Sequence, residues 1–187
     1  MRVAAWAHVW GTAPDELRLS FPCDDLIVNP DATYYRGVTV HAPVTTVFRW
    51  LCQLRVAPYS YDWIDNRGRQ SPRQLTPGLE QLEVGQDVMT IFTLVDFTRD
   101  RHMTIRTKRR SPASNLFGDI AGSYLVVPQA PRTCRLLVKL TVRYPRGLRA
   151  RLMRTLLPWG DLVMMRRQLL NLKSLAEAEA LGQDNPK

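Results

Sequence analysis

The sequence predicts an α+β fold in which a curved antiparallel β-sheet wraps around one long helix near the C-terminus. Several segments between residues 34 and 144 alternate with the two-residue period of strands, most clearly Thr133–Tyr144. Short turns separate these segments, which favours antiparallel pairing of neighbours. From Pro158 to about Leu181, apolar residues recur every three or four positions, as on one face of a helix.

Length and composition indicate one globular domain. The chain has 187 residues, 45% of them hydrophobic, which is enough to bury a substantial core. Cys23, Cys52 and Cys134 have neither the spacing of a metal site nor an obvious pairing, so we expect buried thiols in a reducing compartment, with no metal and no cofactor. No apolar run approaches the roughly 20 residues that span a bilayer. The expected location is therefore the cytoplasm, either free or peripheral at a membrane.

The net charge of +9 comes almost entirely from arginine. Nucleic acid, an anionic membrane surface and a solvated basic exterior are the three interpretations of such a charge. The aromatic residues are not interleaved with the basic ones, and no nucleic-acid-binding motif is present, which argues against nucleic acid. A solvated exterior is the default interpretation, and contact with an anionic membrane surface is the second.

The N-terminal segment, residues 1–33, shows no clean period and contains turn signals around Gly11 and at Pro22 and Pro30. About 33 residues cannot hold an independent core, so we expect an arm packed on the main domain. The domain itself is predicted to cover residues 34–182, and residues 183–187 to form a disordered tail.

The main domain opens with a strand, Tyr34–His41, followed by a helix that begins after Ala42-Pro43. That helix is expected to bury Val47, Trp50, Leu51 and Leu54 on one face and to end before Pro58. The segment 59–66 is the densest aromatic cluster of the chain and is predicted to be a short helix or a loop.

The central strands follow. Leu82–Gln86 is typical of a strand interrupted by a turn, and Asp87–Phe97 is apolar on both parities, which predicts a strand covered on both faces. His102–Arg109 alternates strictly, with Met103 and Ile105 inward and His102 toward solvent. Together with Gly122–Val127 and Thr133–Tyr144, these segments predict a meander that is dry on one face and wet on the other.

Two helices are predicted to end the chain. Gly147–Leu157 is expected to be a short basic helix that places Arg149, Arg151 and Arg154 opposite its leucines. Pro158 suits the first position of the next helix, and Asp161 the first turn. The buried stripe of this closing helix is expected to contain Leu162, Met165, Leu169, Leu172, Ala176 and Ala180.

Beyond this order of elements, several short motifs resemble the helix-grip fold of the START-like superfamily, also called SRPBCC or polyketide cyclase/dehydratase-like. Val38–Pro43 with Trp50 and Leu51 is similar to the opening strand, Ala-Pro turn and first helix of that family. Tyr59–Trp63 resembles the aromatic segment of one bacterial branch, and Met164–Leu169 the closing-helix signature. The resemblance covers residues 24–179 and implies the fold. The superfamily includes lipid carriers, polyketide aromatases and cyclases, and stress-response binding proteins, so the resemblance leaves the chemistry open.

Such a fold commonly leaves an elongated apolar cavity between sheet and helix, which is the usual shape of a small-molecule site. Plain core packing is the simpler interpretation for each residue facing that space. At its rim, the tyrosines and Trp63 of the aromatic segment suit the orientation of a ligand, or form a structural plug. The expected ligand-binding set is Trp50, Tyr59, Tyr61, Asp62, Trp63, Met103, Ile105, Leu136, Val138, Leu140, Leu162, Met165 and Leu169.

Candidate catalytic residues are few. Asp96, if buried beside an apolar cavity, could move a proton because desolvation would raise its pKa. The simpler interpretation is a residue at a strand end that pairs with Arg99 or Arg101. Asp62 and Tyr61 are further weak candidates, and the sequence contains no phosphate-binding loop and no nucleophile elbow.

Three functions therefore remain in consideration. The first is binding of an apolar or amphipathic small molecule, such as a lipid or a polyketide-like ring system. The second is an aromatase/cyclase or dehydratase reaction in the same cavity. The third is attachment to a membrane surface through the basic helix. The sequence identifies neither the ligand nor the oligomeric state.

Overall fold

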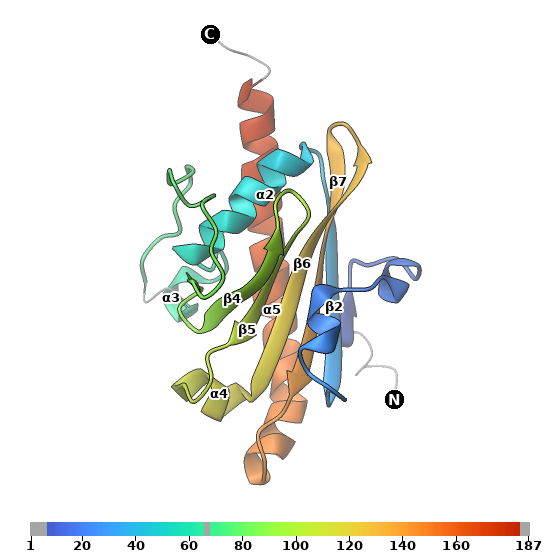
Figure 1. The fold of residues 1–187 in the computed structure, drawn as a ribbon, viewed down its shortest axis with the longest axis vertical. Helices are drawn as coiled ribbons and strands as arrows, with labels where there is room; N and C mark the ends of the chain where they lie inside the picture. The colour runs from blue at the N-terminus through green and yellow to red at the C-terminus, as the bar shows by residue number, and fades with distance from the viewer. Residues whose placement is uncertain (1–6, 66–67, 184–187) are drawn as a thin grey trace.

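The computed structural model of the chain describes residues 7–65 and 68–183 and contains one curved seven-stranded sheet (Figure 1). The strand order is β1-β2-β7-β6-β5-β4-β3, and every neighbouring pair is antiparallel except β1 with β2. The strands are β1 (Val9–Trp10), β2 (Ala32–Val40), β3 (Asp87–Val88), β4 (Phe92–Thr98), β5 (His102–Thr107), β6 (Asp119–Ala130) and β7 (Thr133–Arg143).

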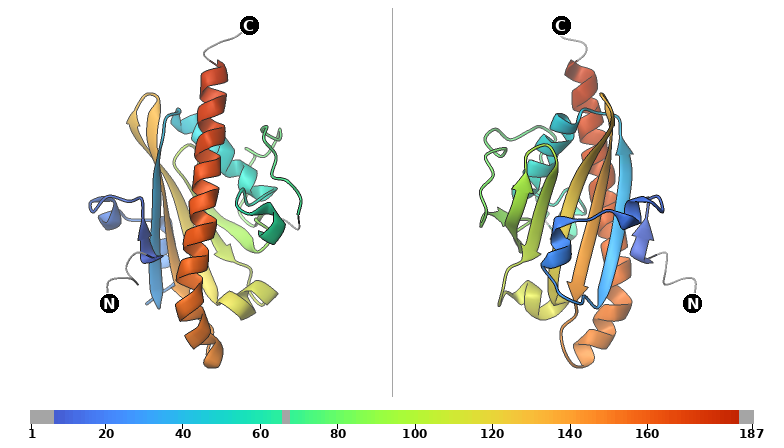
Figure 2. Two further views of the ribbon diagram at one scale, coloured as in Figure 1. Left: turned by 180° about the vertical axis from the view of Figure 1, so that it is seen from behind. Right: turned by 45° about the vertical axis from the view of Figure 1, so that its right-hand side comes forward.

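The helices lie on or beside this sheet. A single 36-residue helix, α5 (Leu148–Gln183), crosses one face of the sheet from end to end (Figures 1 and 2). The shorter helices are η1 (Glu16–Arg18), η2 (Pro22–Asp25), α2 (Val44–Cys52), η3 (Gln53–Arg55), α3 (Asp62–Asp65) and α4 (Pro112–Phe117). The fold is thus α+β, with a curved sheet around a long C-terminal helix, which confirms the predicted class. No helix in the described part of the chain is long and apolar enough to span a membrane.

The predicted inward parity of the central strands is confirmed. In β7, Cys134, Leu136, Val138, Leu140 and Val142 are all buried in the main core. The register that pairs Tyr124 of β6 with Val138 places inward residues of neighbouring strands side by side. From the helix side, Met165, Leu169, Leu172, Ala176 and Ala180 belong to the same core, as the three-and-four spacing predicted.

The opposite face of the sheet is only partly wet: Arg143 is exposed as predicted, but the middle of this face is covered. The N-terminal segment crosses it, and Phe21, Cys23 and Ile27 form a second apolar cluster with Ala121 and Leu137. The Cys23 amide donates a hydrogen bond to Ser123 Oγ at 2.9 Å. The small side chains of Ala121 and Ser123 on this face allow the arm to lie close to the strands. The hydroxyl residues Thr104, Ser123 and Thr141 are therefore buried. Of the arm, residues 1–6 lie outside the described residues.

The strand predicted over Asp87–Phe97 is shorter and less covered than expected. Positive φ angles at Met89 and Thr90 interrupt it, and a register shift follows Leu94. Val95 and Phe97 are only half-buried because β4 lies next to the edge strand β3. Residues 82–86 precede β3 and form turns with no strand.

The two predicted C-terminal helices are one continuous helix, and Pro158 lies inside it. Proline removes a single backbone hydrogen bond, and the packing of a long helix against a sheet can offset that loss. Asp161 is consequently thirteen residues from the N-terminus of the helix and does not interact with its first turn. Residues 184–187 of the predicted tail lie outside the described residues.

Asp161 instead forms a buried ion pair with Arg36 of β2, at 2.7 Å between Oδ2 and a guanidinium nitrogen. Arg36 is completely buried, and it also donates to the backbone carbonyls of Ala7 and Tyr35. Burial raises the pKa of Asp161 to about 6, although the Arg36 charge acts in the opposite direction. This pair ties β2, the strand next to the edge strand β1, to α5.

Candidate functional site

A second buried polar cluster between the sheet and α5 is centred on Gln168. This α5 side chain is buried, and its Oε1 accepts a hydrogen bond of 2.7 Å from the hydroxyl of Tyr124 on β6. Its Nε2 donates to the carbonyl of Pro58 at 2.7 Å and contacts Met89 Sδ at 3.2 Å. Gln168 therefore joins three parts of the fold: the sheet, the helix and the segment that follows η3.

Tyr59 lies beside this cluster in an unusual backbone conformation. Its φ angle is +54°, which non-glycine residues adopt rarely, and Asn171 of α5 donates to its carbonyl at 2.8 Å. The ring packs edge to face on Trp50 of α2, with centroids 6.0 Å apart. Its hydroxyl is buried and finds no hydrogen-bond partner among the described residues. A buried donor of this kind is uncommon and indicates a place for an additional polar partner.

Three methionine sulfurs surround these polar groups. Met89 Sδ contacts Gln168, Met165 Sδ lies 3.9 Å from the Tyr124 hydroxyl, and Met164 Sδ lies 3.6 Å from Ser60 Oγ. Unbranched thioether side chains adapt their shape more easily than branched ones. The wall of the cluster is therefore apolar and deformable.

Both tyrosine hydroxyls in this region remain protonated at neutral pH. Burial raises the pKa of Tyr59 to about 12, with a further contribution from the negative charge of Asp62. Burial also raises the pKa of Tyr124 well above its usual range. The hydroxyls can donate hydrogen bonds to a carbonyl or hydroxyl oxygen, and they cannot serve as bases at neutral pH.

The residues predicted from strand parity and helix spacing lie around this cluster as part of one continuous core. Tyr124, Tyr59, Trp50 and Met165 are buried together in this core, and the partly buried Met89 packs against it. Leu162 is only half-buried and lies outside this core. The members of the predicted set that belong to the core are Trp50, Tyr59, Met103, Ile105, Leu136, Val138, Leu140, Met165 and Leu169.

The rest of the aromatic segment faces away from the interior. Trp63 exposes 76% of its surface, so it does not line the sheet–helix space. The carboxylate of Asp62 accepts hydrogen bonds from the Ser71 amide (2.9 Å) and hydroxyl (2.5 Å), which assigns it to holding the following loop. Tyr61 is half-buried and donates its amide to Ser60 Oγ.

Asp96 is not buried, so the condition for its catalytic role is not met. Its side chain is 55% exposed, and it pairs with His102 Nε2 at 3.0 Å instead of with Arg99 or Arg101. His102, predicted to face solvent, is the buried partner, because its face of the sheet is the one that the N-terminal arm covers. The pair thus lies on the sheet face opposite α5, away from the Gln168 cluster.

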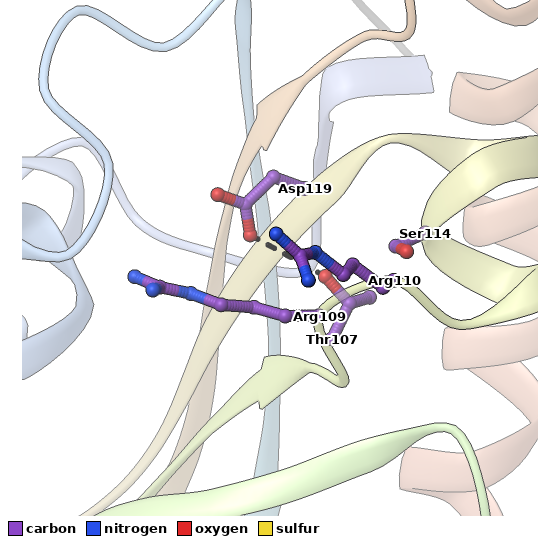
Figure 3. A pocket seen from close by; sticks show the side chains of 5 residues that line it. All are labelled: Thr107, Arg109, Arg110, Ser114 and Asp119. Atoms are coloured by element: carbon purple, nitrogen blue, oxygen red, sulfur yellow. Dashed lines mark hydrogen bonds between the residues drawn. The ribbon is translucent and has the colours of Figure 1, made fainter.

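A hollow of about 310 Å³ lies at a corner of the sheet, between the end of β5, α4 and the start of β6 (Figure 3). Arg106 donates two hydrogen bonds to Asp119, at 3.0 and 2.6 Å, and these hold the pKa of that carboxyl below its ordinary value. The lining is polar, and none of the ligand-binding residues predicted from the sequence belongs to it. The lining residues are Thr107, Arg109, Arg110, Ser114 and Asp119.

No known protein-family profile matches the chain, and no curated protein matches its sequence. Solved structures do match. Protein jhp0584 from Helicobacter pylori aligns over 84% of this chain and 95% of its own, at 12% identity and a TM-score of 0.54. Protein MLL2253 from Mesorhizobium loti aligns over 78% of this chain and 97% of its own, at 12% identity and a TM-score of 0.50.

A third match is the di-domain ARO/CYC BexL from the BE-7585A biosynthetic pathway, at 13% identity and a TM-score of 0.52. It covers 82% of this chain and 48% of BexL, so the chain spans about half of that protein. The chain has the START-like, helix-grip fold. Identities this low establish the shared fold and leave the activity open.

Within this helix-grip fold, the residue patterns did not indicate roles for Gln168, Tyr124 or Asn171. Two weak signals were present: Gln168 follows Met165 by three positions on the apolar stripe, and Tyr124 has the inward parity of Val126 in its strand. A polar residue on an apolar stripe indicates a buried hydrogen bond, but its partners come from segments 44 and 110 residues away. Arg36 is a similar case: it is a charged residue on the face of β2 whose other members, Tyr34, Val38 and Val40, belong to the apolar core.

Proposed function

We propose that this helix-grip chain binds an apolar or amphipathic small molecule, such as a lipid or a polyketide-like ring system, between the sheet and α5. The observation that carries the proposal is the Tyr59 hydroxyl, which is buried without a hydrogen-bond partner among the described residues. Leaving such a group unpaired costs roughly 1–3 kcal/mol, and a polar atom of a ligand would recover that cost.

The surroundings suit this class of ligand. Aliphatic and aromatic side chains form the walls, while the Tyr124–Gln168 pair and the Tyr59 hydroxyl supply a few fixed polar groups. Small-molecule sites generally combine these two features. Since the space is packed in this structure, entry of a ligand requires movement of the methionine side chains, above all Met89, Met164 and Met165.

The same fold occurs in the di-domain ARO/CYC BexL, which keeps a cyclase-type reaction as a second candidate. The two protonated tyrosines could donate to a ligand carbonyl, as an acid-assisted reaction would require. Asp96 lies on the other face of the sheet, and Asp62 is bound to Ser71, so neither supplies a base to the interior. The geometry therefore favours binding over base-assisted condensation.

Fluorescence titration with N-phenyl-1-naphthylamine tests the proposal. This probe is neutral and apolar, so the charge of +9 does not attract it to the surface. Leu169→Trp should reduce its binding at least tenfold, because Leu169 is fully buried and a larger ring fills the proposed space. Leu170→Trp is the matched control, since Leu170 is the next residue on α5 and is exposed.

Overpacking at residue 169 could impair folding, so Gln168→Met provides a second variant that keeps the side-chain volume. It should weaken binding of an amphipathic ligand that carries a carbonyl, such as an oxidised naphthalene, more than binding of the probe itself. Equal probe binding by the wild type, Leu169→Trp and Leu170→Trp, with unchanged circular dichroism, would contradict an interior site. Cyclisation of a poly-β-ketone analogue that Tyr124→Phe abolishes would favour the enzymatic alternative.

A further inference from the structure

The outward face of α5 carries an exposed apolar stripe. In the view from behind, this face of the helix is uncovered along its length (Figure 2). The stripe runs opposite the buried residues Met165 and Leu169, and its members follow the three-and-four spacing of one helix face. A solvated helix normally places polar side chains there. The stripe consists of Leu152, Leu156, Trp159, Val163 and Leu170, which expose 37–55% of their surfaces.

Exposed arginines accompany this stripe. Arg166 and Arg167 flank it between Val163 and Leu170, whereas Arg154, nearer the N-terminal end of the helix, is paired with Asp31. From residue 148 to residue 172 the sequence contains one acidic residue, Asp161, which faces inward and pairs with Arg36. The outward face between residues 152 and 170 is therefore apolar and positively charged, and within this stretch of the sequence the only acidic residue points to the other side of the helix.

We propose that this face of α5 docks on an anionic lipid surface. Apolar side chains with a tryptophan at the centre suit the boundary between headgroups and acyl chains, and arginines suit the phosphates. Residues 152–170 extend over about 27 Å at 1.5 Å per residue, so the stripe would lie along the membrane plane. The charge complements an anionic surface.

A second copy of the chain is the competing occupant. Two stripes facing one another would bring the arginines of both copies together, and like charges at close range oppose association. An anionic membrane removes this repulsion because it supplies the opposite charge. The proposal is independent of the interior ligand, although docking would bring the Gln168 cluster to within one helix diameter, about 10 Å, of the lipid.

Vesicle co-sedimentation tests the proposal with phosphatidylcholine vesicles and with vesicles in which phosphatidylserine replaces part of that lipid. The wild type should pellet with the anionic vesicles and remain in the supernatant with the neutral ones. The double variant Leu156→Gln/Trp159→Gln should lose at least tenfold in affinity for the anionic vesicles. These residues are exposed, so the melting curve by circular dichroism should stay unchanged.

A matched pair of charge variants separates docking from diffuse attraction. Arg166→Gln/Arg167→Gln should weaken sedimentation at least fivefold, whereas Arg109→Gln/Arg110→Gln, which removes the same charge at the β5–α4 corner, should have less than half that effect. The proposal would be overturned if both arginine double variants lost affinity equally and Leu156→Gln/Trp159→Gln bound as tightly as the wild type. An absence of binding to either vesicle, or a wild-type dimer that Leu156→Gln/Trp159→Gln converts to a monomer, would also overturn it.

Discussion

At the scale of single residues, the interior polar groups are unequal in their hydrogen bonding. The Tyr124 hydroxyl satisfies Gln168 Oε1, while the Tyr59 hydroxyl has no partner among the described residues. Removing a hydroxyl that pairs with a buried group leaves that group without a hydrogen-bond partner. Removing an unpaired hydroxyl instead removes the desolvation penalty of burying it. The two tyrosines should therefore respond oppositely to the same chemical change.

Tyr124→Phe should lower the free energy of unfolding by about 1–3 kcal/mol, and Tyr59→Phe should leave it unchanged or raise it slightly. Urea unfolding followed by circular dichroism measures both variants. Each substitution removes one oxygen from a buried ring, so each is the control of the other. Equal destabilisation by the two would show that the Tyr59 hydroxyl is satisfied in the native protein.

The Arg106–Asp119 pair predicts a pH dependence. The Asp119 pKa is lower in the folded protein than its ordinary value of 3.8, mainly because Arg106 hydrogen-bonds to the carboxylate. The folded state thus binds fewer protons than the unfolded state in this range, so the pair stabilises the fold above pH 3.8 and loses its effect as the pH falls below it.

Asp119→Asn should accordingly cost about 1 kcal/mol near neutral pH, a value reduced for the partial exposure of both side chains, and much less near pH 3. Urea unfolding at the two pH values provides the comparison. A cost that is the same at both would mean that the hydrogen bonds to Thr107 or the strand geometry matter more than the charge.

At the scale of elements, two buried polar side chains of α5, Asp161 and Gln168, lie 7 residues apart and bind different parts of the sheet. Asp161 attaches the helix to β2, and Gln168 attaches it to β6 and to the Pro58 carbonyl. Apolar packing alone allows a helix to slide along a sheet, while these directional contacts specify its position.

Asp161→Asn should reduce the free energy of unfolding by about 3–5 kcal/mol at neutral pH, because it leaves the buried Arg36 charge without a counter-ion. Asp87→Asn is a suitable control, since its pair with Lys108 is 67% exposed on the aspartate side and should contribute less than about 1 kcal/mol. Thermal unfolding by calorimetry distinguishes the two. Similar small losses would contradict a structural role for the Arg36–Asp161 pair.

The element scale also shows where sequence patterns were informative. The alternation in Thr133–Tyr144 and the spacing of the helix residues predicted the inward faces of β7 and α5, because the two periods report burial directly. The continuity of α5 through Pro158 was not predictable from local rules, since packing against the sheet overrides a local preference. The cover over His102 and Ser123 depends on the N-terminal arm, more than 75 residues away in sequence.

The candidate site was predictable only in part, and for the same reason. Apolar wall residues such as Met165 and Leu169 follow from periodicity. Gln168, Tyr124 and the Pro58 carbonyl form a cluster only after three distant segments come together. The aromatic composition of residues 59–63 drew attention to Tyr59, which is buried in the core. The positive φ angle at Tyr59 and the outward position of Trp63 depend on the path of the chain after η3, which the composition does not indicate.

At the scale of the whole molecule, the two proposals concern opposite faces of α5. Its inner face contributes Gln168, Met164 and Met165 to the proposed ligand site, and its outer face carries the apolar stripe and the arginines proposed to meet an anionic membrane. A ligand and a membrane surface would thus be separated by the thickness of one helix. This arrangement would allow an apolar molecule to pass between lipid and protein interior over a short path.

The measurement that tests the central claim most directly is methyl NMR of protein labelled at its methionine methyl groups, recorded during titration with N-phenyl-1-naphthylamine. We expect the methyl signals of Met89, Met164 and Met165 to shift together and to saturate with the fluorescence change. The methyl signal of Met153, near the N-terminal end of α5, should not shift. Saturable binding with shifts confined to Met153 or to none of the assigned methyls would contradict a ligand site between the sheet and α5.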